Sequence, residues 1–122
     1  MSGPIEISLL AHPTRLTMAE RSRFRVGLTA TNRSQDSLDP QVYGARLLVD
    51  GEPSAAFDLA IGNGAIPAGW ESLPPGETTH DVEWPLGEAL FEQPGEYLLV
   101  LRLEAVGRDP TESSTTTVVV TD

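Results

Sequence analysis

One apolar stretch, residues 94–104, constrains the fold of this chain more than any other segment. It opens with a Pro-Gly turn signal and continues as the longest run of strand-forming residues in the sequence. Alternate residues from Tyr97 to Leu103 would share one face of a strand, whereas Leu98 and Val100 lie on the other face, which ends in polar residues. A strand that is apolar on both faces needs neighbours, so this stretch predicts the interior of a β-sheet.

Segments with a two-residue period recur along the rest of the chain, and each is bounded by turn residues. The clearest runs from Phe24 to Ala30, where apolar residues alternate with polar residues or glycine. Residues 86–92 are long enough for only one helical turn. The predicted strands cover residues 5–12, 16–18, 23–31, 42–49, 54–61, 78–84, 97–104 and 114–121.

The dipeptide Asp50-Gly51 separates two of these apolar segments and is a strong hairpin signal. The strand that returns from this turn is expected at residues 54–61. With a period of two, Phe57, Leu59 and Ile61 would lie on one face of that strand.

Short strands separated by turn signals predict an all-β fold, an antiparallel two-sheet sandwich of the immunoglobulin or fibronectin type III kind with about seven or eight strands. The first strand breaks at Pro13, where such a strand can move from one sheet to the other. Tyr97 stands where these folds place a tyrosine whose hydroxyl bonds to the backbone at the end of the sheets. At this length, residues 1–122 are expected to form a single domain.

Composition narrows the functional classes. The chain has no cysteine, which excludes disulfides and thiolate zinc sites, and its net charge of −10 should repel nucleic acid. No segment approaches the roughly 18 apolar residues of a membrane span, and no basic region followed by an apolar one occurs near the start. We therefore expect a cytoplasmic protein that binds neither nucleic acid nor membrane.

The sequence contains no recognisable catalytic or cofactor-binding motif. His12 and His80 are its only histidines, and neither is spaced with another good ligand for metal binding. A Gly-x-Ser-x-Gly elbow, a phosphate loop and a dinucleotide fingerprint are all missing. Acidic residues gather at turns, where solvation explains them, although oxygen-rich loops also bind calcium. The expectation is a protein that is not an enzyme and has no cofactor or metal site.

The longest segment without a period is 62–76, which is rich in glycine and proline. Its apolar residues either tuck back to cap the end of the sandwich or face outward as anchors for another protein. The second alternative gives the candidate partner-binding residues, which are Ile66, Pro67, Trp70 and Leu73.

The last predicted strand is β-branched almost throughout and carries no charge before Asp122. Such a strand would need to be covered if it lay at the edge of a sheet. Val118, Val119 and Val120 are therefore candidate edge-strand residues for association with a second chain.

The succession of residues 41–51, 73–78, Trp84 and 94–97 resembles that of the BsuPI-type intracellular proteinase inhibitor domains, and similar motifs occur in bacterial immunoglobulin-like modules. Where that family usually carries a tryptophan-rich strand after the Asp-Gly turn, this chain has residues 53–57. The resemblance implies a cytoplasmic, cysteine-free sandwich that binds a serine protease.

Three functional hypotheses follow from these observations. The first is a non-enzymatic module that binds a protein through the 62–76 loop, and a protease inhibitor is a special case of it. The alternative is a structural or assembly subunit that self-associates through edge strands. The third is a small enzyme or a metal-dependent carbohydrate-binding domain.

Overall fold

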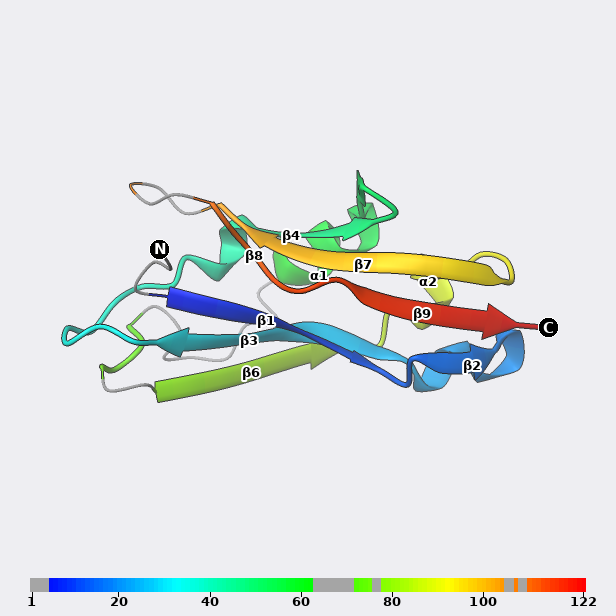
Figure 1. Ribbon diagram of the computed structural model, residues 1–122, viewed down its shortest axis with the longest axis horizontal. Coiled ribbons are helices and arrows are strands. Elements are labelled where there is room, and N and C mark those ends of the chain that lie inside the picture. The colour runs from blue at the N-terminus through cyan, green and yellow to red at the C-terminus, as the bar shows by residue number, and fades with distance from the viewer. Residues whose placement is uncertain (1–4, 63–71, 76–77, 105–106, 108–109) are drawn as a thin grey trace.

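The computed structural model of the protein describes residues 5–62, 72–75, 78–104, 107 and 110–122, which form two β-sheets packed face to face (Figure 1). The three-stranded sheet has the order β1-β3-β6, with β1 at Ile5–His12, β3 at Arg25–Asn32 and β6 at Thr78–Trp84. The six-stranded sheet has the order β2-β9-β7-β4-β5, with β8 also beside β7, and consists of β2 (Arg15–Thr17), β4 (Ala45–Val49), β5 (Glu52–Pro53), β7 (Gly95–Leu103), β8 (Thr111–Glu112) and β9 (Thr116–Thr121).

The prediction of a mainly β, two-sheet fold is confirmed. Neighbouring strands pair in antiparallel fashion except β2 and β9, which run parallel. The strand predicted at 97–104 is β7, which begins two residues earlier, at Gly95, and lies between β9 and β4 inside its sheet. Its inward residues Leu99, Leu101 and Leu103 are buried, as the alternation indicates.

The core lies between the two sheets, and aromatic rings fill the end where β3 begins and β6 ends. Phe24 packs edge-on against Phe91 at 4.8 Å between ring centroids, and Phe57 packs edge-on against Trp84 at 5.3 Å. Phe24, Phe57 and Phe91 have no exposed surface. Burying a side chain of this size contributes about 1.5–3 kcal/mol, so these rings are a major part of the favourable free energy of folding.

The first strand changes sheets, as the break at Pro13 predicts. Before this proline, β1 pairs with β3; after it, β2 pairs with β9 of the other sheet. A 3-10 helix, η1 (Met18–Arg23), then returns the chain to β3. Within it the Arg21 side chain donates hydrogen bonds to the carbonyls of Met18 and Phe91, which ties this crossing to the segment that precedes β7.

The strand expected at residues 54–61 is wrong, because this segment forms helix α1 (Ala55–Gly62). Phe57 and Ile61 are buried one helical turn apart, whereas Leu59 is 66% exposed. The Ser54 hydroxyl accepts a hydrogen bond from the Phe57 N–H at 3.2 Å, as a helix N-cap does. Phe57 and Ile61 are four residues apart, and this spacing places two residues on the same face in a strand and also in a helix. The apparent strand alternation was therefore also compatible with a helix.

The hairpin signal is confirmed, but its second strand is short. Asp50 and Gly51 both have positive φ angles, 52° and 87°, as a two-residue hairpin turn requires, and β5 pairs with β4 over only two residues. The strand expected at 42–49 begins with a 3-10 turn, η2 (Val42–Gly44), before β4. The helical turn expected near 86–92 is α2 (Gly87–Leu90). Within the described part of the chain, no helix is long and apolar enough to cross a membrane.

Candidate functional site

The outer face of the six-stranded sheet carries an apolar stripe across three neighbouring strands, consisting of Leu48, Leu98, Val100 and Val119. In the β-ladder Val100 lies opposite Leu48 on β4, and Leu98 lies opposite Thr117 on β9. The Leu98 side chain is 45% exposed, and the other three are half-buried. The sequence places Leu98 and Val100 on the second face of the strand, and the structure leaves that face uncovered.

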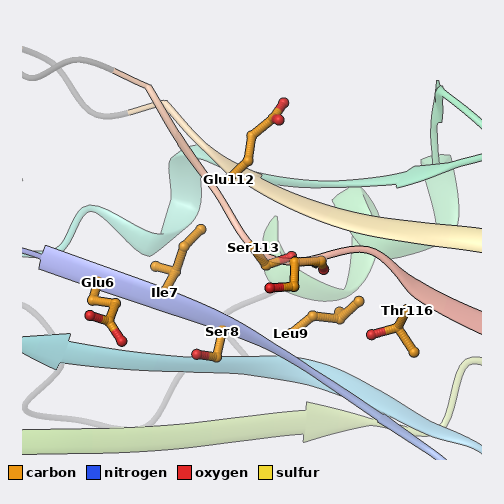
Figure 2. Close-up of a pocket in the computed structure, with 8 residues that line it drawn as sticks. Glu6, Ile7, Ser8, Leu9, Glu112, Ser113 and Thr116 are labelled. Atoms are coloured by element: carbon orange, nitrogen blue, oxygen red, sulfur yellow. Dashed lines mark hydrogen bonds between the residues drawn. The ribbon is translucent and has the colours of Figure 1, made fainter. Parts of the chain in front are cut away.

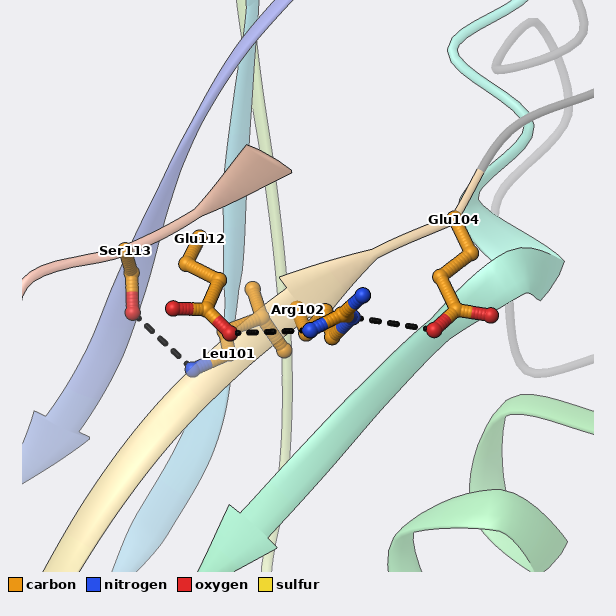
Figure 3. A network of polar contacts seen from close by, with 5 residues as sticks. All are labelled: Leu101, Arg102, Glu104, Glu112 and Ser113. Atoms are coloured by element: carbon orange, nitrogen blue, oxygen red, sulfur yellow. Dashed lines mark hydrogen bonds and ion pairs between the residues drawn. The ribbon is translucent and has the colours of Figure 1, made fainter. Parts of the chain in front are cut away.

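Charged residues bound the apolar stripe at both ends of β7. At one end Arg46 and Arg102 lie directly opposite each other on β4 and β7, an unfavourable pairing of like charges. Carboxylates offset this repulsion: Asp58 lies 3.1 Å from Arg46, and Arg102 contacts Glu104 at 2.9 Å and Glu112 at 3.3 Å (Figure 3). These exposed ion pairs contribute little to stability, but they border this end of the stripe with polar groups whose charges are partly neutralised.

At the other end of β7, the ladder aligns Glu96 with Val119 on β9 and Val119 with Arg15 on β2. Glu96 and Arg15 are exposed, so this end of the face carries one charge of each sign. The apolar stripe therefore has an apolar centre and a polar rim, the arrangement typical of a protein contact surface.

A second candidate is a cleft of about 320 Å³ between β1 and the segment that joins β8 to β9 (Figure 2). Its walls are polar, mainly serine and threonine hydroxyls with two carboxylates, and are formed by Glu6, Ile7, Ser8, Leu9, Glu112, Ser113, Ser114 and Thr116. Among the described residues, none that lines it is aromatic or basic, so these residues offer neither a stacking platform for a sugar nor a cation for an anionic ligand.

Several polar groups of this cleft are committed to the fold. The Ser113 hydroxyl accepts the Leu101 N–H at 2.9 Å and donates to the Ser114 carbonyl at 3.0 Å, which replaces a ladder bond where β8 and β9 separate (Figure 3). Glu6 pairs with Arg33 at 2.7 Å. The cleft is therefore better explained as the open seam between the two sheets than as a ligand site.

The structure describes one of the four partner-binding residues predicted in the 62–76 loop. Leu73 is fully buried, and its backbone exchanges hydrogen bonds with Leu38 at 2.7 and 3.0 Å. For this residue the capping alternative holds, and Leu73 offers no surface to a partner. Ile66, Pro67 and Trp70 lie outside the described residues.

The prediction of an uncovered edge at the last strand needs correction. Strand β9 lies between β2 and β7, and Val119 and Val120 both pair with β2. Val118 and Val120 point into the core, with 0% and 2% of their surfaces exposed. Strand β2 covers the edge of β9, because the crossing from β1 to β2 carries the chain from the three-stranded sheet to β9. Of the three valines, only Val119 contributes to the outer surface.

Asn32, at the end of β3, organises the loop near the predicted contact segment. It is fully buried, and its side-chain amide donates hydrogen bonds to the carbonyls of Asp36 and Leu73 at 2.8 and 2.9 Å. Its Oδ1 accepts bonds from the Ser34 N–H and hydroxyl. Asparagine followed by serine after a strand is typical of a local turn, but no local pattern indicates the link to Leu73, 41 residues away along the chain.

The described residues show no arrangement that supports metal binding or nucleophilic catalysis. No group of three or more histidine and acidic side chains gathers within them. His12 contacts Glu83 at 2.9 Å on the solvent-exposed side of the three-stranded sheet. The indole Nε1 of Trp84 is buried without a hydrogen-bond partner, but Trp84 packs against Phe57 in the core rather than lining the cleft.

One carboxyl in the described region has a clearly altered pKa. The Thr17 backbone N–H donates to Glu20 Oε1 at 2.9 Å, and this hydrogen bond lowers the pKa of Glu20 from its ordinary value. The Thr17 side chain and Arg23 act in the same direction. This is the arrangement of a helix capping box at the start of η1, and it stabilises the crossing between the sheets.

Comparison of the chain with protein-family models, with curated proteins and with solved structures gives no match.

Proposed function

We propose that this protein is a non-enzymatic protein-binding module that contacts its partner through the apolar stripe. The observation that supports this most directly is Leu98, a large apolar side chain that is 45% exposed in the middle of the stripe. A single exposed leucine is ordinary on a protein surface. Here, however, Leu48, Val100 and Val119 extend it into a continuous surface over β4, β7 and β9 with a polar rim.

We also propose that the sandwich is of the immunoglobulin kind. The strand orders β1-β3-β6 and β2-β9-β7-β4-β5, with the first strand divided between the sheets, favour this assignment. So does the Tyr97 hydroxyl, which donates a hydrogen bond to the backbone carbonyl of Gln93. Sandwiches of this kind commonly serve as binding modules, which agrees with the proposed function by analogy of fold.

A protease inhibitor remains a special case of this proposal. The motif succession that resembles the BsuPI-type inhibitor domains supports it, and the cysteine-free composition supports the cytoplasmic location that this resemblance implies. In this special case Ile66, Pro67 and Trp70 would provide the contact. A panel of serine proteases assayed with the wild type and with Trp70→Ala tests it: inhibition by the wild type and not by the variant supports the loop as the contact.

The experiment for the main proposal is affinity capture from a lysate of the source organism, with immobilised wild type, Leu98→Arg and Leu59→Arg compared side by side. Leu59 is the matched control, because it is more exposed than Leu98 but lies on α1, outside the apolar stripe. We expect a protein held by the wild type and by Leu59→Arg to be lost with Leu98→Arg. Equal capture by all three proteins would show that the stripe is not the contact.

A further inference from the structure

We propose that the partner on the apolar stripe is a second copy of this chain, packed face to face about a twofold axis that crosses β7 between Leu98 and Val100. This inference rests on the proposed function, because it uses the same surface and names its occupant. The edges of β9 are not required for it, since β2 and β7 already flank that strand.

The order of outward residues along β7 favours pairing with a copy of itself. From one end to the other these residues are Glu96, Leu98, Val100 and Arg102. A twofold axis in the plane of contact, perpendicular to the strands, reverses this order in the second copy. Glu96 then faces Arg102 of the second copy, and Leu98 faces Val100 of the second copy. By symmetry each contact is made twice, so two apolar and two charge-complementary contacts form along a single strand.

In the rows beside β7, the reversal brings Val119, which is aligned with Glu96, toward Glu112 of the second copy, which is aligned with Arg102. Arg15 lies at the same end of the face as Glu96, because Val119 connects them in the ladder. The reversal brings Arg15 toward the end that carries Glu104 and Glu112 of the second copy. Arg102 contacts both of these carboxylates within its own chain (Figure 3).

The outer face of the six-stranded sheet carries charges of both signs, so a second copy meets opposite charges as well as like ones. The whole chain has a net charge of −10. The outer face of the six-stranded sheet and the groups that contact it carry three arginines and five carboxylates, a net charge of −2: Arg15, Arg46, Arg102, Asp50, Asp58, Glu96, Glu104 and Glu112.

The area of the outer face limits the affinity that is expected for the dimer. With strands about 4.8 Å apart, β2, β9, β7 and β4 span roughly 19 Å, and residues 96–102 of a strand span about 20 Å. The footprint is thus about 400 Å² on each copy, at the low end of specific interfaces. We therefore expect a weak dimer with a dissociation constant on the order of 100 μM, which forms as the protein is concentrated.

Sedimentation velocity of the full chain at concentrations from about 10 μM to about 1 mM tests this inference. The wild type should shift from monomer to dimer across the range. Glu96→Arg and Arg102→Glu each place like charges in both symmetric contacts, so each variant alone should weaken dimerisation at least about tenfold. Glu88→Arg makes the same charge change as Glu96→Arg, but on α2, outside this face, and should leave the shift unchanged.

The decisive step is to mix the two variants. A chain with Glu96→Arg presents two arginines along β7, and a chain with Arg102→Glu presents two glutamates, so the mixture should form a heterodimer although neither variant pairs with itself. A wild type that stays monomeric throughout, or a mixture that fails to associate, would overturn the inference. Thermal melting of each variant, with Leu98→Arg as a second disruptive change, separates loss of the interface from loss of folding.

The outcome also separates this inference from the proposed function. A monomeric wild type whose captured partner is lost with Leu98→Arg would overturn self-association and retain the stripe as a contact surface for another protein. A monomer whose capture is insensitive to Leu98→Arg would overturn both.

Discussion

The outer faces of the two sheets differ although their inner faces serve the same core. On the three-stranded sheet, outward positions carry Glu6, Ser8, Thr29 and Glu83, and the charged groups among them engage neighbours such as Arg33 and His12. On the six-stranded sheet, the corresponding central positions form the apolar stripe. Folding requires only one apolar face from each sheet, so apolar side chains on a second face point to an interaction beyond folding.

The largest effect is expected where the three-stranded sheet depends on close backbone contact. A Cβ added to Gly27 would lie 1.9 Å from the Val82 carbonyl oxygen of β6, so Gly27→Ala must push β3 and β6 apart. We expect a loss of about 3 kcal/mol or more in the free energy of unfolding, measured by urea denaturation. Ser8→Ala, at an exposed position of β1, is the control and should change stability by less than about 0.5 kcal/mol. Equal stability of the two variants would mean that β6 does not approach β3 as described.

A further loss of stability should come from the buried polar group at the end of the same sheet. Asn32→Ala removes both donors to the Asp36 and Leu73 carbonyls and the acceptor of the Ser34 N–H. We expect a loss of about 2–3 kcal/mol, because buried groups are left without partners. Ser34→Ala keeps the bonds to Leu73 and should cost clearly less. Calorimetric melting temperatures of the two variants provide the measurement.

The comparison of faces is sharpest along β7, where adjacent residues point to opposite sides. Leu99→Ala removes a fully buried side chain and should cost about 2–5 kcal/mol. Leu98→Thr, one residue away on the apolar stripe, should cost less than about 1 kcal/mol because threonine suits an exposed strand position. If Leu98→Thr proved as destabilising as Leu99→Ala at low protein concentration, the stripe would belong to the core rather than to a contact surface.

The smallest expected change in stability comes from Glu20, at the start of η1, where the chain crosses from one sheet to the other. Folding lowers the pKa of Glu20, so its hydrogen bond adds stability at pH values above the ordinary pKa of glutamate. This contribution is lost as the pH falls through the lowered pKa of the folded state. Glu20→Gln should therefore reduce the acid dependence of the melting temperature between neutral and low pH, with a small shift because the site is exposed.

Helix α1 illustrates what local pattern alone could not decide. Phe57 and Ile61 fit a strand face and a helix face equally, and Leu59 between them favoured the strand. The alanines around them and Ser54 as an N-cap were the signals for a helix. An eight-residue helix is marginal by itself, and α1 is held by burial of Phe57 against Trp84. Its stability therefore comes from a residue in β6, far along the chain.

The candidate contact surface was predictable in part. The alternation along β7 separated Leu98 and Val100 from the inward residues, but it gave no sign of whether a second layer covers them. The predicted loop contact included Leu73, whose burial depends on Asn32 and Leu38. Whether these side chains are exposed depends on how the sheets and loops assemble around them. The pattern of residues within one segment does not indicate this.

Sequence alone determined the local features of this protein. The two-residue period marked β3, β6 and β7, and Pro13 ended the first strand. The Asp50-Gly51 dipeptide marked the hairpin turn, because these residue types readily adopt the positive φ angles found there. Tertiary structure decided which face of each strand is covered, because β1, β3 and β6 lie against only one side of the six-stranded sheet (Figure 1). Periodicity is set by the geometry of one strand, whereas coverage depends on strands brought together from distant parts of the chain.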